Sequence, residues 1–205
     1  PLINFVAGTD KPVIISTGFA DEPAIAMAAA TVEKIRAGRV NGPEMALLHC
    51  VSAYPVAPED ANLGAVRRLD KRFGENATIG YSDHTLGTQA ATLAIAAGAR
   101  IIEKHFTLDR NYSDFRDHQL SADPAMMADL VKAIREAEVL IGAGDLAPRQ
   151  VERDSETPVR RSIAAAHELQ AGAVVSPKDI MWIRPGEGYA PGRETEVLGR
   201  TLDKS

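Results

Sequence analysis

The sequence predicts an α/β fold in which parallel strands alternate with helices. The first observation is a repeat of four short apolar segments, each followed by an amphipathic or Ala-rich segment. Strand–helix repeats of this kind form parallel sheets with right-handed crossovers. The second observation is that polar residues come at or just after the ends of the apolar segments, where α/β folds place their functional groups. A doubly wound sheet and part of an eight-stranded barrel both fit, and no G-x-G-x-x-G motif supports dinucleotide binding.

The strand–helix pairs follow one another from residue 11 onward. The first predicted strand ends at Ser16, and Asp21 is placed to cap the next helix, with Pro23 in its first turn. Asp123 and Pro124 open the last helix of the series in the same way. The expected strands are 12–16, 45–50, 77–81 and 99–104, and the expected helices are 24–37, 63–73, 88–97 and 123–140.

The repeat stops near residue 141, which predicts a change of domain. Residues 142–160 are polar and rich in turn-forming residues, as is typical of a linker. Residues 161–205 contain three short strand-like pieces separated by turns, 162–166, 172–175 and 181–183. We therefore expect a small, mostly irregular or β-rich module there, near the size at which isolated domains become marginal.

Composition excludes several classes of protein. Of the 205 residues, 45% are hydrophobic and 25% are charged, which is ordinary for a globular protein and too apolar for disorder. The net charge of −5, without a basic block, disfavours nucleic-acid coating, and the apolar runs are too short to cross a bilayer. The single cysteine, Cys50, predicts a small core residue in a reducing compartment, hence a cytoplasmic protein. Because the chain opens on Pro1, we expect a piece of a longer polypeptide.

Two histidines follow consecutive strands at matching positions. His84 comes after the third predicted strand and His105 after the fourth. Because neighbouring parallel strands lie about 4.8 Å apart, side chains from adjacent strand ends can converge on one divalent ion. The alternative is that each imidazole is a core group with its own hydrogen bonds. From the residues alone both interpretations stay open.

Other polar groups at the strand ends admit a binding role or a structural one. The hydroxyls of Ser16, Thr17, Ser52 and Ser82 can bind phosphate or simply form turns. A charge-dense loop after the fourth strand can bind a polar ligand or be solvated. Together with Tyr54, we treat its polar residues as one further candidate cluster: Asp109, Arg110, Asp114, Arg116, Asp117 and His118. Arg184 lies in a tight turn, where its planar guanidinium suits a carbonyl or carboxylate partner, although alone it is typical of a surface residue.

Five segments occur in one order along the chain: Lys-Pro-Val-Ile-Ile-Ser-Thr-Gly (11–18), Leu-Leu-His-Cys-Val-Ser-Ala-Tyr-Pro (47–55), Gly-Tyr-Ser-Asp-His-Thr (80–85), Ile-Glu-Lys-His-Phe-Thr (102–107) and Arg-Pro-Gly-Glu-Gly (184–188). Together they resemble the sialic acid synthases, which include the N-acetylneuraminate, legionaminate and pseudaminate synthases. The resemblance spans nearly the whole chain. It implies the C-terminal half of a (β/α)8 TIM barrel in residues 1–141, a linker over 142–160, and part of a small antifreeze-like (SAF) domain in 161–205.

The resemblance also implies an activity. In this family, phosphoenolpyruvate condenses with an N-acetylated hexosamine such as N-acetylmannosamine. The C3 carbon of phosphoenolpyruvate attacks the open-chain aldehyde, water adds at C2 and phosphate leaves, which gives a nine-carbon 2-keto sugar acid. Such chemistry needs a Lewis acid to polarise the aldehyde and a hydrogen-bonding cradle for phosphate and carboxylate.

Roles for individual residues follow from the same resemblance. His84 and His105 match catalytic ligands of a divalent metal, Mn²⁺ or Mg²⁺. Ser16 and Ser82 resemble phosphoenolpyruvate-binding hydroxyls. Tyr54 and Asp117 match positions that hold the amino sugar, and Arg184 matches an Arg of the antifreeze-like domain that reaches the N-acetyl region of the sugar. Ser52 matches a position beside the phosphate. The family's Arg enters the barrel of a partner subunit, so a domain-swapped homodimer is expected.

Two departures from the family pattern leave the sugar open. Ser52 stands where the pattern often has Asn, and Phe115-Arg116-Asp117-His118 replaces the usual Pro-Gly-Pro-Asp loop. The first four barrel strands of the family, with their acidic residue and phosphate-pairing lysines, would precede Pro1. We therefore expect this chain alone to be weakly active or inactive.

Two alternatives remain beside the synthase. One is a non-catalytic module that self-associates, because a half-barrel leaves two open sheet edges, or that binds sugar through the antifreeze-like segment. The other is a related barrel that condenses phosphoenolpyruvate with an aldehyde to make a deoxy-sugar acid, which the antifreeze-like tail disfavours.

Overall fold

A computed structural model describes residues 1–38 and 44–204 of the chain. The chain divides into two compact units, residues 1–143 and residues 144–205, and each unit is described by itself. No helix within these described residues is both long and apolar enough to span a membrane.

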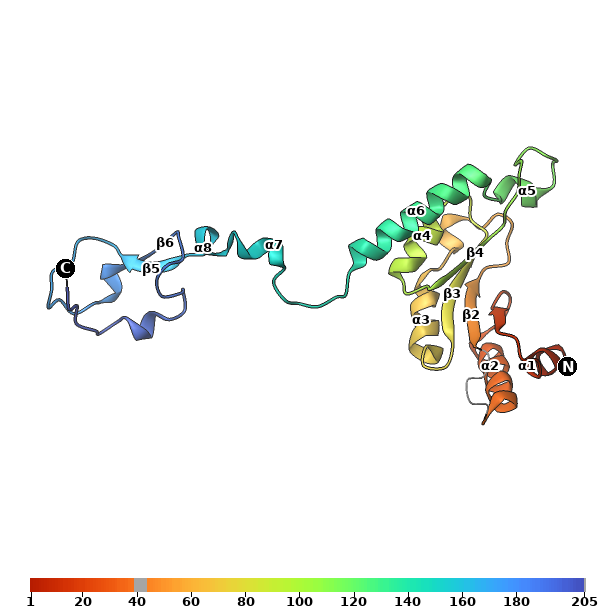
Figure 1. Ribbon diagram of the computed structural model, residues 1–205, viewed down its shortest axis with the longest axis horizontal. Helices are drawn as coiled ribbons and strands as arrows, with labels where there is room; N and C mark the ends of the chain where they lie inside the picture. The colour runs from red at the N-terminus through yellow and green to blue at the C-terminus, as the bar shows by residue number, and fades with distance from the viewer. Residues whose placement is uncertain (39–43, 205) are drawn as a thin grey trace. The chain divides into compact units, whose positions relative to one another are not determined.

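The first unit is built on a four-stranded parallel sheet with the strand order β1-β2-β3-β4 (Figure 1). The strands are β1 Val13–Ser16, β2 Met45–Cys50, β3 Thr78–Asp83 and β4 Ile101–Lys104. Each strand pairs in parallel with the next one along the chain. The predicted α/β half-barrel of parallel strands is thereby confirmed.

Helices flank the sheet in Figure 1. Their bounds are α1 Leu2–Ala7, α2 Glu22–Arg36, α3 Gly64–Phe73, α4 Gln89–Ala96, α5 Arg116–Leu120 and α6 Pro124–Ile141, with a 3₁₀ turn at Pro58–Asp60.

The predicted helix caps are confirmed. The Asp21 carboxylate accepts a bond from the backbone N–H of Ala24 at 2.9 Å, and Asp123 does the same for Met126 at 2.8 Å. The two shortest helices of this unit, α1 and α5, were not predicted, because six and five residues carry too little periodicity.

The core lies between the sheet and its helices. On the strands it contains Leu47, Ile79 and Tyr81, which are at most 2% exposed. Val32 of α2 and Val66 of α3 pack against the same cluster. Each such fully buried aliphatic side chain contributes about 1.5–3 kcal/mol, so this interface stabilises the packing of the helices on the sheet.

The opposite face of the sheet carries a different set of residues. Side chains alternate along a strand, and in-register neighbours share a face. The register pairs Leu48 with Gly80 and Cys50 with Ser82, so these residues form rungs on the face away from Leu47. On the edge strand, Ile14 of this face is 57% exposed. We call this second face the open face because its edge strand is exposed, although Leu48 at its centre is fully buried.

Gly80 is needed for the close approach of β2 and β4 on this second face. A Cβ at Gly80 would lie 2.4 Å from Cδ2 of Leu48 and 2.5 Å from the carbonyl oxygen of Ile101. We expect Gly80→Ala to lower the free energy of unfolding by about 1–3 kcal/mol, measured by urea denaturation. Gly64→Ala is the control, because its Cβ would have no heavy atom nearer than 4.0 Å. Equal stability of the two variants would contradict this account.

His49 makes the first unit sensitive to acid. Its ring is buried on β2, lies 3.0 Å through Nε2 from the carbonyl oxygen of Ala61 and stacks on Tyr81. Burial lowers the pKa of His49 below its ordinary value of 6.5. Below pH 6.5 the unfolded chain therefore binds a proton that the folded chain excludes, so stability falls with pH down to the lowered pKa and is retained above 6.5.

We expect His49→Gln, which keeps a donor for Ala61, to flatten this dependence. The measurement is the free energy of unfolding in urea at several pH values between 5 and 8. A parallel slope in parent and variant would show that His49 does not carry the effect.

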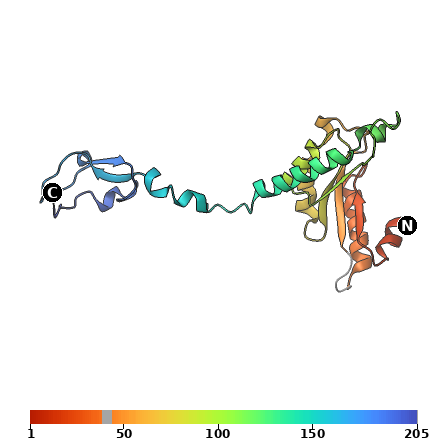
Figure 2. The ribbon, with the colours of Figure 1, turned by 45° about the horizontal axis from the view of Figure 1, so that its top comes forward.

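The second unit is mostly irregular. Its regular elements are α7 Gln150–Arg153, α8 Glu156–Val159, an antiparallel pair of strands β5 Ser162–Ala165 and β6 Ile180–Ile183, and 3₁₀ turns at Pro177–Asp179 and Glu194–Glu196 (Figure 2). Two of the three predicted strand-like pieces are confirmed. The third, 172–175, forms only a single bridge between Val174 and Thr201. The loop after β6 folds back onto β5, where Ser162 Oγ donates to the carbonyl oxygen of Pro185 at 2.9 Å.

Candidate active site at the carboxyl ends of the strands

The polar residues after the strands lie on the open face of the sheet. Ser82 is in register with Cys50 and Glu103 on this face. His84 and His105 follow Ser82 and Glu103 by two residues, so strand alternation places them one rung further towards the carboxyl edge. Ser16 is in register with Leu48 and lies one rung below Ser82.

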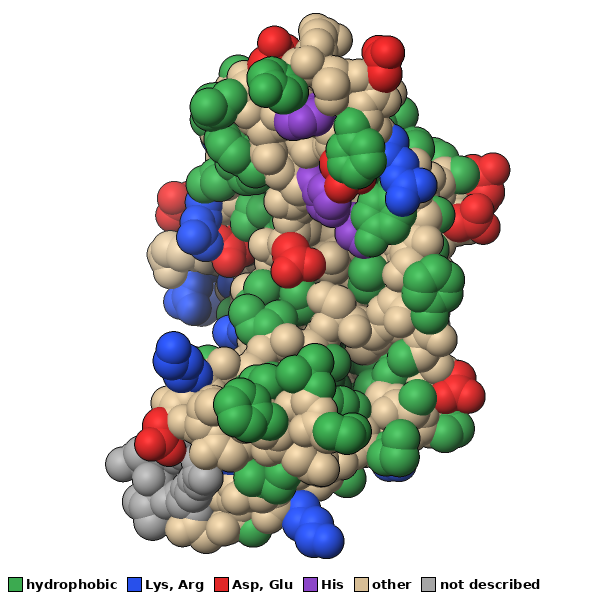
Figure 3. All heavy atoms as spheres, turned by 90° about the vertical axis from the view of Figure 1, so that its right-hand side faces the viewer, with side chains coloured by type: hydrophobic (Ala, Val, Ile, Leu, Met, Phe, Trp, Pro, Cys, Tyr) green, Lys and Arg blue, Asp and Glu red, His purple; other side chains and the backbone are tan. Residues whose placement is uncertain are grey.

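Two imidazoles meet at this edge. The ring centroids of His84 and His105 are 5.2 Å apart with the planes nearly perpendicular. Tyr54, on the loop after β2, contacts both, with centroid distances of 4.3 Å to His84 and 5.8 Å to His105. Figure 3 shows histidine side chains reaching the surface close together, with hydrophobic side chains around them. The sequence-predicted pair and Tyr54 are therefore one cluster.

The hydrogen bonds of His84 determine which of its nitrogens is available. Nδ1 lies 2.8 Å from the carbonyl oxygen of Val51, which can only accept, so Nδ1 carries the proton. When the ring is neutral, Nε2 then has a free lone pair. A histidine bound to a metal through one nitrogen usually donates from the other in this way.

His105 is flanked by a carboxylate. Its Nδ1 lies 4.0 Å from Oδ2 of Asp117, which belongs to α5. Both side chains remain about one-third exposed, at 30% and 38%. The neighbouring Arg116 places its guanidinium 5.1 Å from the ring centre of Tyr54. The short helix α5 thus brings Asp117 next to the histidine pair, and its role in holding the sugar stays a prediction.

A divalent ion was predicted at the two histidines. The donor set fits two of its ligands, because the tautomer of His84 leaves Nε2 unprotonated and His105 stands beside it. Across residues 1–38 and 44–204 no group of three or more His, Cys, Asp or Glu side chains is arranged to hold a metal. His84 and His105 would thus supply two of the ion's coordination positions.

Glu103 belongs to the site and was not predicted. Ser82 Oγ donates to Glu103 Oε1 at 2.6 Å, which couples the hydroxyl predicted to bind phosphate to an exposed carboxylate. Its position two residues before His105, on the same face of β4, is the signal that could have identified it. A carboxylate here can accept a proton or orient water next to the imidazoles.

Ser52 is held against the backbone of the loop after β1. A Cβ at Gly18 would lie 2.1 Å from Ser52 Oγ and 3.4 Å from Cys50 Sγ. Only glycine leaves this space, so Gly18 and Ser52 form a small cradle of backbone and hydroxyl. Such a combination suits an anionic oxygen.

Gly18→Ala tests this cradle. We expect the methyl group to displace the Ser52 hydroxyl and to weaken binding of a phosphate or carboxylate ligand by about 10-fold, the loss of roughly one charge-assisted hydrogen bond. The measurement is the affinity for inorganic phosphate by calorimetry. Ser52→Ala should give a similar loss, and parent-like affinity in both variants would contradict the assignment.

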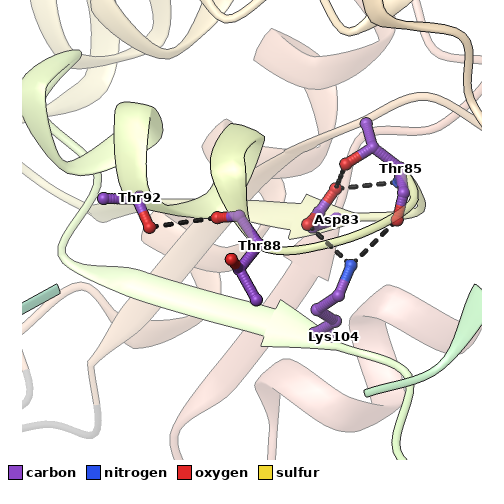
Figure 4. Close-up of polar contacts among 5 residues, drawn as sticks. All are labelled: Asp83, Thr85, Thr88, Thr92 and Lys104. Carbon is purple, nitrogen blue, oxygen red and sulfur yellow. Dashed lines mark hydrogen bonds and ion pairs between the residues drawn. The ribbon is translucent and has the colours of Figure 1, made fainter. Parts of the chain in front are cut away.

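A buried ion pair lies under the histidines and was also not predicted as part of the site. Lys104 Nζ donates to Asp83 Oδ2 at 2.8 Å and to the carbonyl oxygen of Thr85 at 2.9 Å. Asp83 Oδ1 accepts from the backbone N–H and the hydroxyl of Thr85, both at 2.8 Å (Figure 4). Burial and then the charge of Asp83 raise the pKa of Tyr81 far above its ordinary value.

The charge-dense loop after β4 is largely engaged with itself. Arg110 donates through Nε and Nη2 to the carbonyl oxygen of Gln119 at 3.2 and 2.7 Å. Thr107 donates its hydroxyl to the carbonyl oxygen of Asp109, so its bond with His118 is one that it accepts. These groups therefore shape the loop that carries α5. Arg184 lies in the second unit, and its role stays a prediction.

A family model described as "NeuB family" matches residues 1–145, well over half of the chain. The chain belongs to the NeuB family. The matched residues contain the whole sheet and the histidine cluster, so the NeuB assignment covers the candidate site. The family predicted from the five sequence segments is thereby confirmed.

Relatives of this NeuB chain have names that refer to different sugar acids. The N,N'-diacetyllegionaminic acid synthase of Legionella pneumophila is 40% identical over 98% of the chain and 56% of its own length. The pseudaminic acid synthase of Campylobacter jejuni is 33% identical over 98% of the chain and 56% of its own length. The crystal structure of an N-acetylneuraminic acid (sialic acid) synthetase from Leptospira borgpetersenii, in complex with citrate, is 37% identical with a TM-score of 0.67. That match covers 75% of this chain and 51% of the crystallised one.

The NeuB chain spans just over half the length of the Legionella and Campylobacter synthases. The three relatives described above are named as sugar acid synthases.

Proposed function

We propose that this chain supplies the carboxyl-terminal half of the active site of a synthase that condenses phosphoenolpyruvate with an N-acetylated hexosamine. The products are a nine-carbon 2-keto sugar acid and phosphate. One observation carries the proposal: His84 and His105 face each other at the edge of the sheet, with Tyr54 and Asp117 beside them. This arrangement offers two imidazoles, a phenol and a carboxylate to one small polar substrate.

Each group has a task that its chemistry allows. A divalent ion, Mn²⁺ or Mg²⁺, would be held by His84 and His105 and would supply Lewis acidity at the sugar aldehyde. Tyr54 and Asp117 bind sugar hydroxyl groups, and Asp117 also orients His105. Glu103 accepts a bond from Ser82 and can hold the proton of the water that adds at C2 of phosphoenolpyruvate.

The anionic end of phosphoenolpyruvate is assigned to the hydroxyl groups. Ser52 in its cradle against Gly18 and, one rung below Ser82, Ser16 donate to phosphate or carboxylate oxygens. The Ser82 hydroxyl, which donates to Glu103, joins them only when it turns from that carboxylate to the substrate. Hydroxyl groups alone do not balance the charge of this substrate. The rest of the barrel is therefore assigned the cationic groups, and the chain alone is expected to turn over slowly or not at all.

The second unit is assigned to the antifreeze-like domain of the synthase. In this proposal its Arg184 reaches the N-acetyl end of the sugar in a partner copy, which makes the enzyme a domain-swapped homodimer. A guanidinium suits this role because it can donate two parallel bonds to a carbonyl. The Arg184-Pro185-Gly186 turn is held against β5 by Ser162, so its backbone is fixed within the unit.

The experiment that tests the proposed function also identifies the amino sugar. The relatives' names refer to legionaminic, pseudaminic and N-acetylneuraminic acids. The test is release of phosphate from phosphoenolpyruvate with each member of a panel of such sugars, with and without Mn²⁺. The protein is assayed as this chain and as the longest reading frame that contains it.

The expected result is phosphate release that requires both one amino sugar and a divalent ion. Release without any sugar, or no release with any sugar from the complete reading frame, would overturn the proposal. Turnover by the 205-residue chain alone at the rate of the complete reading frame would contradict the assigned role of the other barrel residues.

A further inference from the structure

The ion pair of Asp83 and Lys104 is too deeply buried to be explained by stability alone. The two side chains are 0% and 1% exposed. Removing two charges from water is costly, and apolar residues of the same volume often serve a fold equally well. Both bonds donated by Lys104 cross from the end of one strand to the end of the next, which points to a geometric role.

The pair sits where the main-chain ladder between β3 and β4 ends. The last in-register residues are Asp83 and Lys104 themselves. Beyond them the two strands turn to other partners, since the carbonyl oxygen of His84 accepts from Val56 and that of His105 accepts from Ala122. The bond from Lys104 Nζ to the carbonyl oxygen of Thr85 is therefore a cross-strand link above the ladder.

The bonds from Lys104 fix the residues on both sides of His84 in the chain. Asp83 and Thr85 are its two chain neighbours, and both are bound to Lys104, which is itself the neighbour of His105 (Figure 4). Side chains alternate between the two faces of a strand. When the side chains of Asp83 and Lys104 are fixed on the face that packs against the helices, those of His84 and His105 must therefore point from the open face.

We propose that Asp83 and Lys104 are positioning residues that hold the imidazoles of His84 and His105 at their mutual distance and orientation. The pair touches no substrate and acts through the backbone of residues 83–85 and 104–105. The Nδ1 bond of His84 to the carbonyl oxygen of Val51 is a second contact that orients the ring. The proposal rests on the proposed function in one respect, namely that the two imidazoles are held in this geometry to bind a divalent ion.

The experiment compares three variants of the 205-residue chain. Asp83→Asn with Lys104→Met removes both charges and the cross-strand link. Asp83→Asn with Lys104→Gln is also neutral, but it keeps an amide donor at position 104 for the side-chain oxygen at position 83 or the carbonyl oxygen of Thr85. It therefore tests whether a hydrogen bond without charge restores the link. Leu130→Ala, at a buried site in α6, is a control for general loss of stability.

Two readouts are needed. The first is the long-range ¹H–¹⁵N spectrum of the histidine rings at pH 8, which reports whether His84 carries its proton on Nδ1. The second is the affinity for Mn²⁺, measured from the electron paramagnetic resonance signal of the free ion. In the Asn–Met variant we expect His84 to lose its single Nδ1-protonated form and Mn²⁺ affinity to fall by about 10–100-fold, as when an orienting partner of a metal ligand is removed.

The Asn–Gln variant and Leu130→Ala should resemble the parent in both readouts. Parent-like rings and parent-like affinity in a folded Asn–Met variant would overturn the proposal. An unfolded Asn–Met variant would overturn it too, since the pair would then be a requirement of the fold. If the parent itself binds no Mn²⁺, the metal role under the proposed function fails, and the ring spectra alone decide the positioning role.

Discussion

Replacement of His105 by alanine is expected to lower kcat/KM for metal-dependent phosphate release by more than about 100-fold. Removing a second-sphere partner of a ligand already costs about 10–100-fold, and removing a ligand costs more. His105 also faces His84 at 5.2 Å and Asp117 at 4.0 Å, so its loss opens the centre of the cluster. The measurement is steady-state release of phosphate over a range of Mn²⁺ concentrations, with the complete reading frame.

His167→Ala is the matched control for this variant. His167 lies in the second unit, where its Nε2 is 3.1 Å from Oδ1 of Asp179, and it has no place in the proposed chemistry. It should keep kcat/KM within about two-fold of the parent. Unchanged turnover and unchanged Mn²⁺ dependence in His105→Ala would refute the role of this histidine as a ligand.

The second large effect concerns stability. Lys104→Met alone leaves the Asp83 carboxylate buried without its cation, and we expect the free energy of unfolding to fall by about 3–5 kcal/mol. When Asp83→Asn is added, the buried charge disappears and Thr85 can still donate to the side-chain oxygen. The double variant should therefore recover most of the loss, and urea denaturation of the 205-residue chain measures both.

The pattern of recovery distinguishes a buried charge from simple loss of packing. If the double variant were as unstable as Lys104→Met, the cost would lie in the lost methylene packing or hydrogen bonds and not in the unpaired carboxylate. Stability within about 1 kcal/mol of the parent for Lys104→Met itself would show that water reaches Asp83.

The regular part of the fold follows from local patterns. The strands at 13–16 and 45–50 are continuous apolar runs, and such runs are typical of parallel strands that are buried on both faces. The caps Asp21 and Asp123 set the starts of α2 and α6 through bonds between residues three apart. Local bonds of this kind can be predicted because the sequence separation is small.

The short elements were harder to predict. α1 and α5 have too few residues for a helical period, and α5 matters because it carries Asp117 to His105. The segment 172–175 has the composition of a strand, yet its backbone bonds to residues 199–202 amount to one isolated bridge, between Val174 and Thr201. Whether an apolar segment becomes a strand depends on which neighbour is available to pair with it, and this is a tertiary property.

The residues of the candidate site divide in the same way. Sequence alone identified His84, His105 and Tyr54 as candidates because of their types and their positions after predicted strands. It did not identify Glu103 as the acceptor for Ser82, or Asp83 and Lys104 as a buried pair. Charged residues are normally exposed, so their burial is evident only once the register of β3 and β4 is known.

The sequence by itself determined the family, the alternation of strands and helices, and the edge of the sheet at which the polar groups gather. These properties depend on local periodicity and on motifs that lie within a few residues of each other. Only the tertiary structure decided that Nδ1 of His84 is bound to Val51, that Gly18 leaves room for Ser52, and that Lys104 links two strand ends. These contacts join residues 19 to 34 positions apart, so they depend on the register of the strands and the packing between them, which no local pattern specifies.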